Sequence, residues 1–292
     1  MLRHLDRVLQ KMVGLPYLFA TFDGDTHCRC RYLLHQLKAL DGEGLSVLDV
    51  GCGAGVALHY LATSKPGRIG RYVGLDRQAE HLNGRSRRVQ GINVTFHNVD
   101  LEDDWDVGVF DVVWCSEVIE HLNDDAGQMQ KLLRAARPGG LVVMTTPGPI
   151  FRHSIDHHNA PRQTSEARLH GGALRPGDLI DDMERLAARA GLIVESIDGV
   201  IRVTPDAFQK REKVQGPARV INNIKMNWRA QGLQDFASGR RFRAEPEHYM
   251  SVGAILRRPV DPIMIRPNPK AIATRMPKQD GVSQDRTKMA VF

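Results

Sequence analysis

Apolar and polar residues alternate along the middle of this chain with two different periods. Short apolar runs that end in polar residues indicate buried β-strands, and longer stretches with an apolar residue every three or four positions indicate helices. Strands are predicted near residues 46–50, 71–76, 93–98, 109–115, 140–146, 192–197 and 248–256. Helices are predicted near residues 2–13, 28–40, 55–64, 77–89, 125–137 and 176–190.

This regular alternation predicts an α/β fold of the Rossmann-like, doubly wound type. A parallel sheet needs cover on both faces, which the intervening helices supply, and ligands of such folds bind beyond the carboxyl ends of the strands. We expect a helical cap over residues 1–44, a main domain over 45–259 and a basic tail over 260–292. Two insertions, at 147–176 and 198–247, are expected to carry substrate specificity, or alternatively oligomer contacts.

A glycine-rich turn follows the first predicted strand, within the sequence VLDVGCGAG at residues 47–55. Gly51, Gly53 and Gly55 have the spacing Gly-x-Gly-x-Gly, which differs from the dinucleotide spacing Gly-x-Gly-x-x-Gly. Asp49 lies just before the turn, where its carboxylate would repel a pyrophosphate and attract a cation. S-adenosylmethionine fits this requirement, because it carries an ammonium and a sulfonium but no phosphate.

Two later strands lead into acids. The strand at 71–76 ends at Asp76, where a carboxylate can accept hydrogen bonds from ribose hydroxyls. The strand at 93–98 leads to Asp100, which could accept from an adenine amino group, with Leu101 beside it for the face of the ring. The sequence therefore predicts an adenosyl-binding edge shared by successive strands.

The fourth strand leads into a segment with the sequence SEVIEHL at residues 116–122. With this segment the chain resembles the class I S-adenosylmethionine-dependent methyltransferases, in particular the group with Glu-Val-Ile-Glu-His-Leu after the fourth strand. The resemblance covers roughly residues 45–200 and a last strand near 250. It implies a mostly parallel seven-stranded sheet whose last strand is antiparallel and lies between its neighbours.

The resemblance also implies roles for individual residues. The acid and glycines of the turn would hold the methionyl side of the cofactor, Asp76 the ribose, and Asp100 with Leu101 the adenine. The segment from Ser116 would line the sulfonium side. S-adenosylmethionine is accordingly the expected cofactor.

Methyl transfer depends mainly on positioning, and a base helps only where the acceptor must lose a proton. Glu117, Glu120 and His121 are the candidate bases nearest the expected methyl group. At the start of a helix they would fall at i, i+3 and i+4 and share one face, although the acids could simply favour the helix N-terminus electrostatically. Further candidates in the first insertion are His157, His158 and His170, and this insertion also contains His153.

Three functions remain open on these residues. The first is methyl transfer without a metal to an oxygen or nitrogen of a small molecule or glycan. The second is metal-dependent methylation of RNA 3′ ends, because enzymes of the Hen1 type resemble this chain in having Glu-x-x-Glu-His after the fourth strand; a later histidine such as His157 or His170 would complete that site. The third is a non-catalytic binding or structural subunit, since a fold does not fix an activity.

Charge is divided unevenly along the chain. Residues 1–200 carry 22 Lys and Arg against 26 Asp and Glu, whereas residues 201–292 carry 18 against 8. The basic C-terminal part could bind nucleic acid or another anionic partner, or could be a solvated surface and a loose tail.

Composition agrees with an ordinary globular protein, with 42% hydrophobic and 25% charged residues among 292. No segment is long and apolar enough for a membrane span, and the charged N-terminus does not resemble a signal peptide. Four cysteines are too few for a disulfide framework. We therefore expect a cytoplasmic protein; the sequence does not indicate its oligomeric state.

Overall fold

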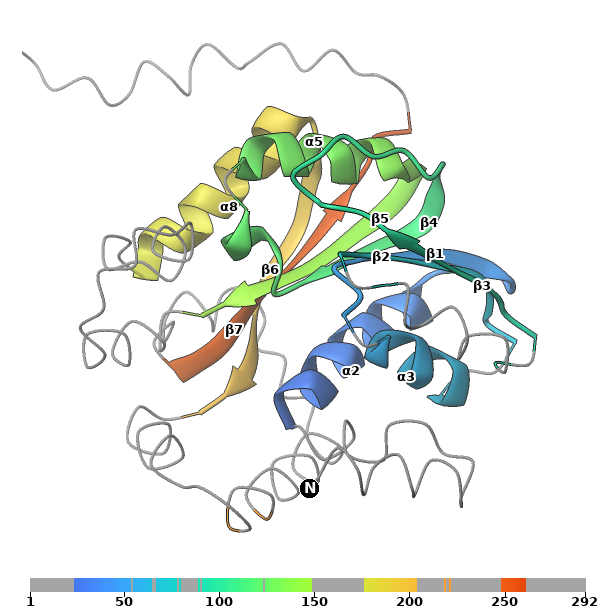
Figure 1. Ribbon diagram of the computed structural model, residues 1–292. Helices are drawn as coiled ribbons and strands as arrows, with labels where there is room; N and C mark the ends of the chain where they lie inside the picture. Colours follow the sequence, from blue (N-terminus) through green and yellow to red (C-terminus); the bar gives the residue numbers. More distant parts are fainter. Residues whose placement is uncertain are drawn as a thin grey trace, which may run out of the picture. The chain divides into compact units, whose positions relative to one another are not determined.

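The computed structural model describes residues 24–53, 55–64, 67–77, 79, 89, 91–122, 124–148, 176–203, 218, 221 and 248–260. Within these residues the chain forms a seven-stranded sheet with the order β3-β2-β1-β4-β5-β7-β6 (Figure 1). The strands are β1 (Leu45–Val50), β2 (Ile69–Asp76), β3 (Asn93–Asn98), β4 (Phe110–Ser116), β5 (Ala136–Pro147), β6 (Ile193–Arg202) and β7 (Tyr249–Arg257). Strand β7 is antiparallel to β5 and β6, and the four pairings β3–β2, β2–β1, β1–β4 and β4–β5 are parallel. The predicted fold class is confirmed.

Helices cover both faces of the sheet (Figure 1). They are α2 (Gly24–Ala39) and α3 (Val56–Ser64) on one face, and α5 (Asp125–Ala135) and α8 (Pro176–Ala190) on the other. Alternate residues of β1 enter the two cores: Val47 belongs to the cluster with α2 and α3, and Leu48 and Val50 belong to the cluster with α5 and α8. This period of two is what a strand buried on both faces requires.

The boundary between α5 and β5 differs from the prediction. The expected helix at 125–137 ends at Ala135, and β5 begins at Ala136 rather than near residue 140. Pro138 lacks the N–H that a helix needs, and Gly139 has a positive φ of 75°. The pairing of β4 with β5 is irregular here, since Phe110 faces Ala136 but Val112 faces Leu141.

Several predictions lie outside the described residues. These are the helix at 2–13, most of the helix at 77–89, nearly all of both insertions and the basic tail after residue 260. The expected helix at 28–40 is present as α2 and begins four residues earlier, at Gly24.

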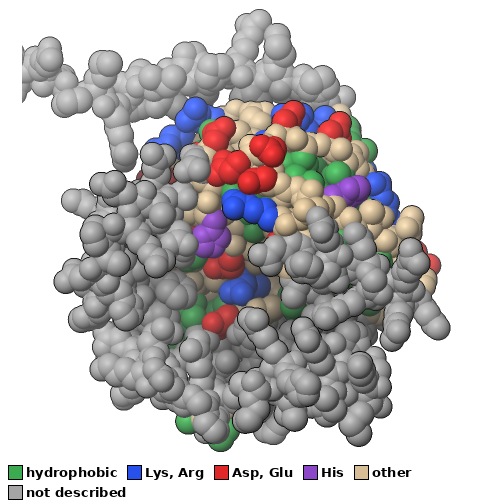
Figure 2. Space-filling model, viewed as in Figure 1, with side chains coloured by type: hydrophobic (Ala, Val, Ile, Leu, Met, Phe, Trp, Pro, Cys, Tyr) green, Lys and Arg blue, Asp and Glu red, His purple; other side chains and the backbone are tan. Residues whose placement is uncertain are grey.

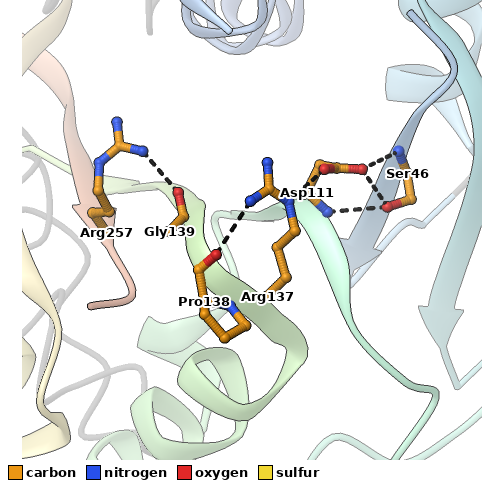
Figure 3. Close-up of polar contacts among 6 residues, drawn as sticks. All are labelled: Ser46, Asp111, Arg137, Pro138, Gly139 and Arg257. Atoms are coloured by element: carbon orange, nitrogen blue, oxygen red, sulfur yellow. Dashed lines mark hydrogen bonds and ion pairs between the residues drawn. The ribbon is translucent and has the colours of Figure 1, made fainter. Parts of the chain in front are cut away.

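A polar network fastens the amino ends of the strands (Figure 3). The Ser46 backbone N–H and hydroxyl donate to Asp111 Oδ2 at 2.9 and 2.7 Å, and Arg137 Nε donates to Asp111 Oδ1 at 2.6 Å. Arg257 donates to the Gly139 carbonyl at 2.8 Å and so ties β7 to β5. Burial would raise the pKa of Asp111, but the hydrogen bonds from Ser46 and Arg137 outweigh burial and lower it.

The described surface carries both signs of charge. Figure 2 shows acidic and basic side chains next to one another on the face seen in Figure 1. Arg134 of α5 pairs with Asp104 at 2.7 Å, and Arg185 of α8 pairs with Asp182. In the part of the chain that the structure describes, no helix has the length and apolar character needed to cross a membrane.

Candidate cofactor and acceptor site

The glycine-rich turn after β1 has a backbone that only glycine adopts easily. Gly51, Gly53 and Gly55 have φ angles of 76°, 50° and 73°. A Cβ on Gly51 would lie 2.3 Å from Cγ2 of Val118, so the turn packs directly against the segment that follows β4. Around Gly53, in contrast, a Cβ would meet no atom of the described residues within 4 Å. The turn therefore presents bare backbone to open space at the carboxyl edge of the sheet.

Asp76 joins this turn to the end of β2. Its Oδ2 accepts a hydrogen bond from the Gly53 backbone N–H at 3.0 Å. The residue is half-buried at the strand end, as expected for a carboxylate that accepts from a ribose. The two predicted cofactor elements are thus brought together by the fold.

Asp100 lies in the turn after β3, at the same edge. Its Oδ1 accepts from the Glu102 backbone N–H at 3.0 Å, and its Oδ2 lies 3.4 Å from Nε of Arg77. The side chain is 41% exposed and can still meet a ligand, while the neighbouring Leu101 is buried.

Asp49 is buried inside the sheet, with 3% exposure, and accepts a short hydrogen bond from the Tyr72 hydroxyl of β2. Burial raises the pKa of Asp49 to about 7, the Tyr72 hydrogen bond opposes this, and the nearby charge of Asp76 adds to it. Asp49 is therefore enclosed rather than open, and its attraction for a cationic ligand stays a prediction.

These residues fit S-adenosylmethionine. The open backbone at Gly53 leaves room for close approach, the half-buried Asp76 offers an acceptor for ribose hydroxyls, and Asp100 with Leu101 offers an acceptor beside an apolar surface. When bound, the cofactor supplies an electrophilic methyl group on a positive sulfur.

The segment after β4 contains the acids predicted to face that methyl group. Ser116 forms a hydroxyl–hydroxyl hydrogen bond of 2.8 Å with Thr145 of β5. Glu117 adopts a left-handed φ of 54°, and its Oε1 accepts from the Ser251 hydroxyl of β7 at 3.2 Å. A non-glycine residue with this φ is strained, and such residues concentrate at functional sites.

Glu120 is almost fully buried, with 1% exposure. Its Oε2 accepts from the Thr146 hydroxyl at 3.4 Å, while no hydrogen-bond donor among the described residues reaches its Oε1. Nε2 of His121, on a side chain that is 49% exposed, lies 3.8 Å from Oε1. Burial, and after it the charge of Glu117, raises the pKa of Glu120 to about 8; burial also raises the pKa of Glu117.

The predicted helical arrangement of this segment is wrong. Ile119–His121 form a single 3-10 turn rather than the start of an α-helix, because the left-handed backbone at Glu117 interrupts any helix there. Glu117 and Glu120 are near enough to influence each other electrostatically, but Glu120 is turned inward and His121 outward.

Sequence reasoning missed the residues that surround these acids. Thr145, Thr146 and Ser251 supply the hydroxyls, and the charge of Arg29 of α2 opposes the rise in the pKa values of both glutamates. The polar pair Thr145-Thr146 at the end of an apolar strand was a visible signal. Ser251 and Arg29 are distant in sequence and had none.

No group of three or more His, Cys, Asp or Glu that could hold a metal occurs among the residues the structure describes. His157 and His170, the two histidines predicted as the later metal ligand, lie outside those residues, as do His153 and His158.

Comparison with known proteins gives a family. The model of the methyltransferase domain family matches residues 41–191, just over half of the chain. An uncharacterized 37.1 kDa protein in a transposon of Streptomyces fradiae is 30% identical over 192 residues, which cover 63% of this chain and 54% of that protein. The ubiquinone biosynthesis O-methyltransferase of Sodalis glossinidius is 34% identical over 122 residues, which cover 40% of this chain and 47% of that protein. The chain thus spans about half the length of these relatives.

Solved structures share the fold at low sequence identity. A methyltransferase in complex with the Trm112 methyltransferase activator of Haloferax volcanii has a TM-score of 0.50 at 18% identity, covering 82% of this chain and 93% of that one. The small RNA methyltransferase HEN1 has a TM-score of 0.50 at 19% identity, and the match covers 79% of this chain and 25% of that one. The chain belongs to the methyltransferase domain family, with the class I fold and S-adenosylmethionine as the cofactor of that group.

Proposed function

We propose that this protein transfers a methyl group from S-adenosylmethionine to an oxygen atom of a small-molecule acceptor. In this proposal the glycine turn, with the enclosed Asp49 behind it, and Ser116 hold the methionyl and sulfonium side, Asp76 holds the ribose, and Asp100 with Leu101 holds the adenine. Glu120 takes the proton from the acceptor hydroxyl.

The under-paired carboxyl of Glu120 carries the proposal. It lies after β4, two residues beyond Val118, whose side chain packs on Gly51, and one of its oxygens accepts no hydrogen bond from the described residues. Its pKa of about 8 is close to neutral pH, where a general base is most effective. A hydroxyl acceptor must lose its proton during transfer, so it has use for such a group.

Glu117 and His121 have supporting roles in this proposal. Glu117 is held by Ser251 and raises the pKa of Glu120 through its charge. His121 is exposed and 3.8 Å from Glu120 Oε1, so it can pass the proton on to solvent. The relatives named as ubiquinone biosynthesis O-methyltransferases support oxygen as the acceptor atom. Nitrogen acceptors and glycans are the less favoured choices.

The test has two stages. Calorimetry with S-adenosylmethionine should show binding to the wild-type protein, and incubation with methyl-labelled cofactor and a panel of phenols, catechols, amines and sugars should label a hydroxyl compound. Labelling of amines alone would contradict oxygen transfer. Binding without labelling of any fraction of a host extract would favour the non-catalytic subunit.

A metal-dependent ribose methyltransferase is the second candidate. The observation that favours it is the pair of glutamates with His121 beside one of them, a partial set of metal ligands. The basic C-terminal part would then serve an RNA acceptor. EDTA should abolish this activity and a divalent ion restore it, whereas indifference to EDTA would exclude this candidate.

A further inference from the structure

Lys131 of α5 makes an unusual set of contacts with the turn that follows β3. Its ammonium nitrogen donates to three successive carbonyl oxygens, those of Leu101 at 2.8 Å, Glu102 at 3.2 Å and Asp103 at 2.7 Å. An ammonium has three protons, so these contacts use all of its donors on one stretch of backbone.

The amide groups of the same turn point to Asp100. The Glu102 N–H donates to Asp100 Oδ1 at 3.0 Å, and the Asp103 N–H donates to the Asp100 carbonyl at 3.1 Å. The carbonyls are thus held by Lys131 and the N–H groups by Asp100. The conformation of the turn and the direction of the Asp100 carboxylate are therefore linked.

The helix that carries Lys131 is firmly placed. The carboxylate of Asp124 caps α5 by accepting from the Gly127 N–H at 2.8 Å, and Met129 and Leu132 are fully buried in the core. An anchor on such a helix can hold a surface turn in one conformation.

We infer that Lys131 is a positioning residue for cofactor recognition, which fixes the turn so that Asp100 can accept a hydrogen bond from the adenine amino group. This inference rests on the proposed function, in which Asp100 faces adenine. Lys131 does not touch the cofactor in this scheme and acts through the turn. Its effect should therefore be a loss of selectivity for adenine.

The test compares two cofactor products that differ at one group. S-adenosylhomocysteine has the exocyclic amino group, and its purine-riboside analogue has a hydrogen atom in its place, so a carboxylate has no N–H there to accept from. The wild-type protein should bind the adenosine compound at least about tenfold more tightly, because a site built for a hydrogen bond rejects a ligand that lacks it. In Lys131→Met this preference should fall to about twofold or less.

Arg134→Met is the matched control. Arg134 lies one turn further along α5 and pairs with the exposed Asp104. The substitution therefore removes a cation from the same helix but leaves the three carbonyl groups bound to Lys131. Its preference for the adenosine compound should equal that of the wild type. Lys131→Arg, which keeps the charge but not the three-donor geometry, should be intermediate.

The outcomes separate the inference from the function on which it rests. Absence of binding to either compound by the wild type would remove the proposed function itself. Wild-type binding with an unchanged preference in Lys131→Met, or an equal loss for both compounds, would overturn the inference. If Lys131→Met does not fold, Lys131→Arg decides in the same way: a reduced preference supports the inference and an unchanged preference refutes it.

Discussion

The two edges of the sheet hold carboxyl groups in opposite conditions. At the amino edge, Asp111 is matched by donors from Ser46 and Arg137, and its pKa is lowered in spite of burial. At the carboxyl edge, burial raises the pKa values of Glu117 and Glu120, and Glu120 keeps one oxygen without a hydrogen bond among the described residues. In the proposed function, the acid at the amino edge stabilises the fold and the under-paired acid at the carboxyl edge accepts the proton.

The largest expected effect is on catalysis at the carboxyl edge. Glu120→Gln keeps the shape and the Thr146 contact but cannot accept a proton. Methyl transfer should fall by about 10²–10⁴-fold, while the affinity for S-adenosylmethionine should change by less than about twofold. Steady-state kinetics and calorimetry measure the two quantities. The matched variant is His121→Gln, and a larger loss there than in Glu120→Gln would transfer the base role to His121.

The next effect concerns cofactor affinity. Asp76→Asn should weaken binding of S-adenosylmethionine by about 10–100-fold, because hydrogen bonds to a charged group contribute roughly 1.5–3 kcal/mol. Asp106→Asn is the control, since Asp106 also accepts from a glycine N–H, that of Gly108 at 2.9 Å, but lies near the amino edge. Equal affinity of Asp76→Asn and wild type in calorimetry would contradict the ribose assignment.

A smaller effect is expected on stability at the amino edge. Asp111→Asn should lower the free energy of unfolding by about 1–2 kcal/mol at neutral pH, with activity per folded molecule unchanged. Because the folded-state pKa of Asp111 is depressed, its stabilisation is present above its ordinary value and is lost as pH falls through the folded value. The difference from wild type in urea unfolding should therefore shrink in acid. Asp104→Asn, which breaks only an exposed ion pair, should cost less than about 0.5 kcal/mol.

A separate effect on stability is the reverse pH dependence at Glu120. Its folded-state pKa of about 8 lies above the ordinary 4.5, so the folded protein holds this proton more tightly than the unfolded chain. Ionisation thus destabilises the fold progressively from about pH 4.5 to above pH 8. Glu120→Gln has no carboxyl group to ionise and is not destabilised in this way. The difference between its melting temperature and that of the wild type should therefore increase in favour of the variant from pH 6 to pH 9. A constant difference across that range would argue against the raised pKa.

Much of the fold could be predicted because the buried sheet imposes simple patterns on sequence. The seven strands were visible as apolar runs, and the resemblance implied the antiparallel last strand. The glycine turn was recognised from its spacing, and its positive φ angles explain why glycine is needed there.

The details of the acceptor side could not be predicted from local sequence. The left-handed backbone at Glu117 turns an apparent helix start into a 3-10 turn, and no residue pattern at 116–122 indicates it. The hydrogen bond from Ser251 to Glu117 and the electrostatic effect of Arg29 on both acids depend on how α2 and β7 pack, which only the tertiary structure specifies. Asp49 was expected to face the ligand, but Tyr72 of the neighbouring strand holds it inside the sheet.

Carboxyl-carbon NMR titration of the protein labelled at aspartate and glutamate tests the contrast between the two edges most directly. Spectra of Glu120→Gln and Asp111→Asn assign the two signals. We predict that Glu120 titrates near pH 8 and Asp111 below 3.8 in the same sample. A Glu120 signal that titrates near 4.5 would contradict the proposal that this buried, under-paired carboxyl is the proton acceptor.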